Sequence, residues 1–192
     1  MHDGVTAEVS RSRPPALLTV GTIVWLASEL MFFGGLFATY FTLRAEASEW
    51  PPAGVTLDTT ISAIATVVLL SSSVTIHFAG KALERDDRAG VRLWLMVTLT
   101  LGAVFLANVV REFIMNDFSI SSSAYGSIYY LMVGFHGLHV LGGLVLIAIA
   151  IALVTGPGLL GRRGPGVESV TYYWHFVDVI WVGLFTTIFI IR

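Results

Sequence analysis

Long apolar runs separated by short polar stretches dominate this sequence. Five such runs cover residues 16–43, 59–80, 93–110, 126–154 and 169–191. Each is close to or longer than the roughly 20 residues that an α-helix needs to cross the hydrocarbon core of a bilayer. The pattern predicts an all-α, polytopic membrane protein, with a bundle of five transmembrane helices in one domain (residues 16–192) after a polar tail over residues 1–15.

The distribution of basic residues between the loops predicts how this bundle is oriented. An odd number of spans places the two termini on opposite sides of the membrane. The tail and the second and fourth loops hold eight of the eleven Lys and Arg residues, namely Arg11, Arg13, Lys81, Arg85, Arg88, Arg92, Arg162 and Arg163. Because basic residues accumulate in cytoplasmic loops, we expect a cytoplasmic N-terminus and an external C-terminus.

Composition supports the membrane assignment and excludes several kinds of site. Hydrophobic residues make up 55% of the 192 residues and charged residues only 12%, with a mean hydropathy of +0.80. The absence of cysteine excludes disulfides, thiolate metal sites and haem attachment through Cys. No stretch resembles a nucleotide site, a nucleophilic triad or a nucleic-acid-binding patch, so no nucleic-acid partner is expected.

The polar residues inside the predicted spans are the candidate functional residues. At a rise of about 1.5 Å per residue, they separate by depth. The middle of the membrane is expected to hold Glu29 and His136, and the outer end of the third helix Glu112. The remaining four share the cytoplasmic half and could converge if their helices touch: His77, His139, His175 and Asp178.

Each candidate has a structural interpretation beside a chemical one. His175 and Asp178 lie three residues apart on one helix face, where polar contacts between helices are expected. Glu29 is expected to be protonated or hydrogen-bonded to a neighbouring helix, with proton transfer as the alternative. His136 and His139 have a spacing compatible with a metal site. The glycines around them favour close helix contact, with both imidazoles as interhelical hydrogen bonders.

Two independent activities compete with a purely structural role. A haem- or metal-binding membrane oxidoreductase would use His136, His139 and His175, whereas a proton-linked transporter would use Glu29 and Asp178. The histidines are too few and too spread in depth for a di-iron site. No internal repeat or proline-broken span indicates a transporter. The residues alone therefore predict polar contacts between helices, with no catalytic residue and no metal site assigned.

Five stretches, in order along the chain, together resemble subunit III of the haem-copper oxidases. They are residues 25–33 (WLASELMFF), 50–52 (WPP), 123–127 (SAYGS), 134–140 (GFHGLHV) and 173–181 (YWHFVDVIW). The resemblance extends from residue 20 to residue 192 and is closest to the short, five-helix bacterial form of actinobacterial cytochrome aa3-type oxidases. Glu29, His136, His139, His175 and Asp178 match positions of the family's motifs, and Glu112 matches an acidic position at the end of the equivalent helix.

This resemblance implies a non-catalytic subunit of a cytochrome c oxidase, a complex that reduces dioxygen and pumps protons across the bacterial plasma membrane. The haems and copper ions are then expected in subunits I and II, and no cofactor is expected in this chain. Subunit I is the expected main partner, where this chain supports proton uptake. Subunit II, phospholipids and a cytochrome bc complex in a supercomplex are the other expected partners.

Two points stay open within the resemblance. Quinol oxidases and nitric oxide reductases have related third subunits, so the electron donor depends on whether the neighbouring subunit II carries a copper site. Longer family members have two further N-terminal helices that form one wall of a lipid-filled cleft. The sequence departs from them there, so a closed cleft is not implied, although a lipid could lie against the remaining bundle.

Overall fold

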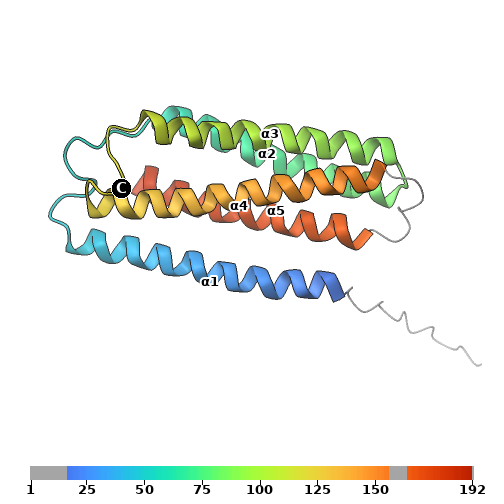
Figure 1. The fold of residues 1–192 in the computed structure, drawn as a ribbon, viewed down its shortest axis with the longest axis horizontal. Coiled ribbons are helices and arrows are strands. Elements are labelled where there is room, and N and C mark those ends of the chain that lie inside the picture. Colours follow the sequence, from blue (N-terminus) through green and yellow to red (C-terminus); the bar gives the residue numbers. More distant parts are fainter. Residues whose placement is uncertain (1–16, 156–163, 192) are drawn as a thin grey trace, which may run out of the picture.

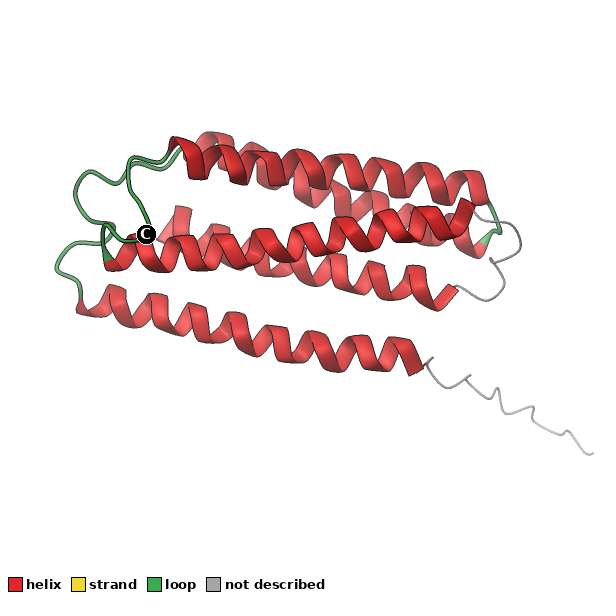
Figure 2. Cartoon of the chain, in the orientation of Figure 1, coloured by secondary structure: helices red, strands yellow, loops and turns green. Residues whose placement is uncertain are grey.

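A computed structural model describes residues 17–155 and 164–191 (Figures 1 and 2). Its elements are α1 (Leu17–Glu46), α2 (Thr59–Glu84), α3 (Arg88–Met115), α4 (Ala124–Thr155), α5 (Gly164–Phe185) and a π-helical continuation, η2 (Thr186–Ile191). Within these residues, five helical segments are long and apolar enough to cross a membrane, and no strand is present. The predicted all-α bundle is confirmed. The tail and the fourth loop lie outside the described residues, and the orientation in the membrane stays a prediction.

The helices run side by side along one common direction, with α5 in contact with three others (Figure 1). Helices α2 and α3 form a tightly packed antiparallel pair, and α4 packs on α3. Helix α5 lies against α1, α2 and α4, whereas α1 lies at one edge and packs mainly on α4 and α5. This arrangement places the residues of α5 at the centre of the contacts between helices.

Helices α2 and α3 extend further than the apolar runs indicated. The charged residues Lys81 and Arg92, which the hydropathy pattern assigns to a loop, lie inside the helices. Lys and Arg are good helix formers, and their long side chains carry the charge away from the apolar surface. The turn is instead set locally, because Asp86 has a φ of 54° and the Asp87 carboxylate caps α3 by accepting from the Gly90 N–H at 2.9 Å.

The packing around Trp174 fixes how closely three helices approach α5. Its side chain is completely buried, and its indole N–H donates to the Ser72 hydroxyl at 2.8 Å. A Cβ atom at Gly102 of α3 would come within 2.6 Å of the ring, and one at Gly143 of α4 within 2.8 Å. Both helices therefore need glycine there, because any other residue would overlap the indole.

The C-terminal end of α1 is tied to the end of the last helix. The Tyr40 hydroxyl donates to the Thr187 carbonyl at 3.3 Å, and the Arg44 guanidinium donates to the Ile191 carbonyl at 2.9 Å. Both carbonyls belong to the π-helical turn, where the wider winding changes the usual backbone hydrogen bonding. These contacts join the first and last spans of the bundle.

Candidate functional site

Glu29 and His139 form a contact between α1 and α4. The Glu29 carboxylate lies 3.1 Å from Nε2 of His139, and the two side chains are only 22% and 16% exposed. On the other side of the ring, Nδ1 lies 2.7 Å from the Phe135 carbonyl, which can only accept, so Nδ1 carries a proton. A hydrogen bond between Nε2 and Glu29 needs one further proton, which sits either on the Glu29 carboxyl group or on Nε2. Glu29 therefore has a hydrogen-bond partner on a neighbouring helix, as we expected from the sequence.

The surroundings of this pair are aromatic. Tyr173 of α5 donates its hydroxyl to the His139 carbonyl at 2.9 Å, and Trp25 stacks on the Tyr173 ring with centroids 5.4 Å apart. A shallow groove of about 350 Å³ lies alongside, lined by Trp25, Leu138, His139, Gly142, Leu146 and Tyr173. Helices α1, α4 and α5 thus meet at one polar contact bordered by an apolar groove.

A Glu29→Leu variant should be less stable by about 1 kcal/mol, because His139 Nε2 loses the one side-chain hydrogen-bond partner that it has among the described residues. Thermal unfolding of the purified chain in detergent measures this. Glu29→Gln keeps a hydrogen-bonding group and should stay closer to the unaltered chain. Glu46→Leu, at the exposed end of the same helix, is the matched control and should change little. Equal stability of the two leucine variants would contradict a role for the pair.

His175 and Asp178 contact α2 rather than α4. Both lie beside the Ser73 hydroxyl, which donates to the Asp178 carboxylate and lies 3.1 Å from Nδ1 of His175. Asp178 is only 3% exposed, and its second carboxylate oxygen has no hydrogen-bond partner among the described residues. The three residues join α2 and α5 through one shared hydroxyl.

The hydroxyls of α2 are the contact residues that sequence reasoning missed. They hold neighbouring helices through the pairs Ser62–Glu112, Thr66–Trp181 (2.9 Å), Ser72–Trp174 (2.8 Å) and Thr75–Thr98 (2.7 Å). Thr66 and Ser72 each also donate to a carbonyl of their own helix, which leaves a lone pair for the tryptophan N–H. Ser62 and Thr66 are four residues apart and Ser72 and Thr75 are three apart, so each pair shares one side of the helix, a signal already present in the sequence.

Glu112 and His136 are buried in different ways. Glu112, 7% exposed, is held near the C-terminal end of α3 by Ser62. His136 is fully buried, stacks on Trp181 with centroids 5.0 Å apart and meets the edge of Phe105. Neither ring nitrogen of His136 has a hydrogen-bond partner within the described chain. His136 therefore packs as an aromatic ring and not as the interhelical hydrogen bonder that we expected.

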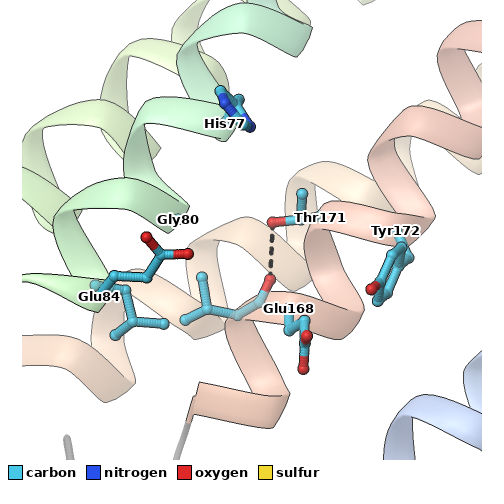
Figure 3. A pocket seen from close by; sticks show the side chains of 8 residues that line it. His77, Gly80, Glu84, Glu168, Thr171 and Tyr172 are labelled. Carbon is cyan, nitrogen blue, oxygen red and sulfur yellow. Dashed lines mark hydrogen bonds between the residues drawn. The ribbon is translucent and has the colours of Figure 1, made fainter.

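His77 is exposed and lines a cavity of about 440 Å³ between the end of α2 and the start of α5. Figure 3 shows His77 above the cavity, with Glu168, Thr171 and Tyr172 on the opposite helix. Glu84, Gly80, Leu83 and Val167 complete the lining.

Of the four residues that we expected to converge, His77, His175 and Asp178 lie between α2 and α5, whereas His139 lies apart from them. His139 contacts Glu29 on α1, whereas His175 and Asp178 contact Ser73 on α2. The position of a residue in the sequence gives its depth in the membrane, but it does not show which neighbouring helix the side chain faces. His136 and His139 also point to different neighbours, and the described residues contain no group of three or more His, Cys, Asp or Glu that could hold a metal ion.

Carboxylate–imidazole and hydroxyl pairs between helices are the arrangement by which membrane helices hold one another. A family model described as "Cytochrome c oxidase subunit III" matches residues 13–191.

The chain also aligns with relatives over nearly its whole length. It is 43% identical over 192 residues to the probable cytochrome c oxidase subunit 3 of Nocardia farcinica, covering 98% of this chain and 95% of the relative. It is 41% identical over 184 residues to cytochrome c oxidase subunit 3 of Corynebacterium diphtheriae (93% and 90%) and 40% identical over 178 residues to that of Thermostichus vulcanus (92% and 89%). The prediction of an oxidase subunit III is confirmed, and the chain belongs to the cytochrome c oxidase subunit III family.

Proposed function

We propose that this chain is a non-catalytic subunit that stabilises subunit I of an aerobic terminal oxidase in a bacterial plasma membrane. In that complex, subunits I and II carry the haems and copper, electrons pass from cytochrome c to dioxygen, and protons are pumped. The observation that carries the proposal is the pairing of polar groups within the bundle. Asp178, His175 and Ser73 contact one another, and Glu29 contacts His139. These groups hold the helices of the bundle in a fixed arrangement.

The same proposal includes lipid contact and support of proton uptake. The exposed side of α1 is rich in large apolar side chains such as Ile23, Val24 and Met31, which suits acyl chains. The groove beside Trp25 and Tyr173 is a place where one acyl chain could lie. We also propose the cytoplasmic N-terminus, and assembly with a cytochrome bc complex, as expectations from the charge distribution and the family.

Deleting this subunit should leave the haem absorption spectrum of the purified oxidase nearly unchanged, because the subunit supplies no haem ligand. The number of turnovers before inactivation should fall severalfold, since subunit I loses its support. Visible spectra and oxygen consumption over time measure the two quantities on the same preparation. Loss of the haem signals while subunits I and II remain assembled would contradict the proposal, as would an unchanged active lifetime.

A further inference from the structure

One side of the bundle carries polar side chains that face outward within the span. It is the surface between α2 and α5, called here the α2–α5 seam. Its members lie on the two facing helices and comprise Ser73, His77 and Glu84 of α2 with Glu168, Thr171 and His175 of α5. Ser73, Thr171 and His175 are half-buried, whereas His77, Glu84 and Glu168 are exposed.

The outward side of α4 is different. Its exposed large side chains are all apolar, namely Leu131, Phe135, Leu138, Leu141, Val145, Ile149 and Leu153. Such a surface suits acyl chains. An imidazole exposed to acyl chains would lack a hydrogen-bond partner, which is unfavourable in hydrocarbon. The seam is therefore the surface that needs a polar partner.

The seam's own residues leave its polar groups available. Within the described chain no side chain hydrogen-bonds to His77, Glu84 or Glu168. The Thr171 hydroxyl is occupied, because it donates to the Val167 carbonyl at 3.0 Å (Figure 3). Among the described residues, the lining of the cavity of about 440 Å³ at this end of the seam contains two carboxylates and neither Lys nor Arg. Its charge is complementary to a cation.

We propose that the α2–α5 seam is the docking surface for a transmembrane helix of a partner oxidase subunit. That helix carries a Lys or Arg opposite Glu84 and Glu168 and a hydrogen-bonding side chain deeper in the membrane, opposite His77 and His175. The proposal rests on the proposed function, in which the chain is held in an oxidase complex. The proposal adds that the chain docks through the α2–α5 seam and that the partner helix carries a basic and a polar side chain.

The depth of the polar groups selects a helix over a lipid. A lipid headgroup amine could reach the two carboxylates at the membrane edge, but its acyl chains cannot hydrogen-bond to groups further in. His77 lies seven residues before Glu84 on α2, which corresponds to about 10 Å along the helix. A partner helix lying along α2 should thus have its basic residue about seven residues from its polar one.

Photo-crosslinking in the intact purified oxidase tests the seam. A benzoyl-phenylalanine placed at Val74 or Val179, which flank the seam and are 55% and 68% exposed, should crosslink to another oxidase subunit. Leu138 and Val145 on α4, at 61% and 52% exposure, are the matched controls and should give no protein crosslink. Peptide mass spectrometry should locate the crosslink in a transmembrane segment with the predicted basic and polar residues.

Crosslinks from α4 but not from the seam would overturn the proposal, as would seam adducts with lipid alone or with a segment that lacks the basic residue. These failures differ from failure of the proposed function. If the unaltered chain copurifies with the haem-carrying subunits while the seam crosslinks only to lipid, the proposed function stands and the docking face is wrong.

A double Glu84→Gln and Glu168→Gln variant provides a second test that does not depend on the probe. Removing both charges leaves the partner's cation unpaired, so the variant should dissociate from the complex about tenfold faster in detergent. A Glu46→Gln and Glu49→Gln variant, which removes two exposed carboxylates at the opposite end, should dissociate at the original rate. Equal dissociation rates for the two double variants would overturn the proposal.

Discussion

A Trp174→Ala variant is expected to lose on the order of 3 kcal/mol of stability. The indole is completely buried and fills the space left by Gly102 and Gly143, so its removal opens a cavity where α3, α4 and α5 meet. Acyl chains cannot reach this cavity, and the lost van der Waals contacts are therefore not replaced. The Ser72 hydroxyl also loses the hydrogen bond that it accepts from the indole N–H at 2.8 Å. Thermal unfolding in detergent, followed by circular dichroism, measures the loss.

Trp25→Ala is the matched control for this substitution. Trp25 is 45% exposed and contacts Tyr173 by stacking alone, so its removal should cost at most about 1.5 kcal/mol. A Trp174→Ala variant that unfolds at the same temperature as Trp25→Ala would show that the contact between the three helices is not the main packing site of the bundle.

An Asp178→Leu variant should be less stable by about 1–3 kcal/mol, although leucine has a similar size and suits the membrane better. The loss arises because the Ser73 hydroxyl no longer has the carboxylate to which it donates, between two helices that exclude water. The readout is the detergent concentration at which the purified oxidase releases this subunit. Release at the same concentration as the unaltered complex would contradict the role of Asp178.

Two companion variants separate the hydrogen bond from the charge at Asp178. Asp178→Asn keeps an acceptor oxygen for Ser73 and should recover most of the stability, within about 1 kcal/mol. Asp117→Leu, at an exposed position after α3, should have an effect below about 0.5 kcal/mol. A defect in Asp178→Asn as large as in Asp178→Leu would indicate that the negative charge itself matters.

The sequence allowed prediction of the spans because hydropathy depends on length and composition alone. It failed at the ends of α2 and α3, where charged residues continue the helix and the turn depends on the positive φ of Asp86 and the capping carboxylate of Asp87. Hydropathy averages over a window and cannot register a single capping carboxylate. The five-helix bundle was thus predictable, but the length of each helix was not.

The candidate site was predictable as a set of residues but not as a set of pairs. The cost of a carboxylate in hydrocarbon required that Glu29 and Asp178 have partners. Choosing them needs the rotation of each helix about its axis, which depends on packing such as that of Trp174 against the two glycines. For the same reason His139, one turn from His136, turns towards α1 while His136 is enclosed by Phe105 and Trp181.

The contacts of α1 have a consequence for the assembly of the chain during synthesis. Helix α1 precedes the other four helices along the chain, yet its main neighbours are α4 and α5, and its C-terminal end is held by carbonyls of the final turn. Until those spans enter the membrane, α1 has lipid around it and Glu29 has no imidazole beside it. A nascent chain stalled after α3 would therefore contain Glu29 without the His139 imidazole that lies beside it in the complete bundle.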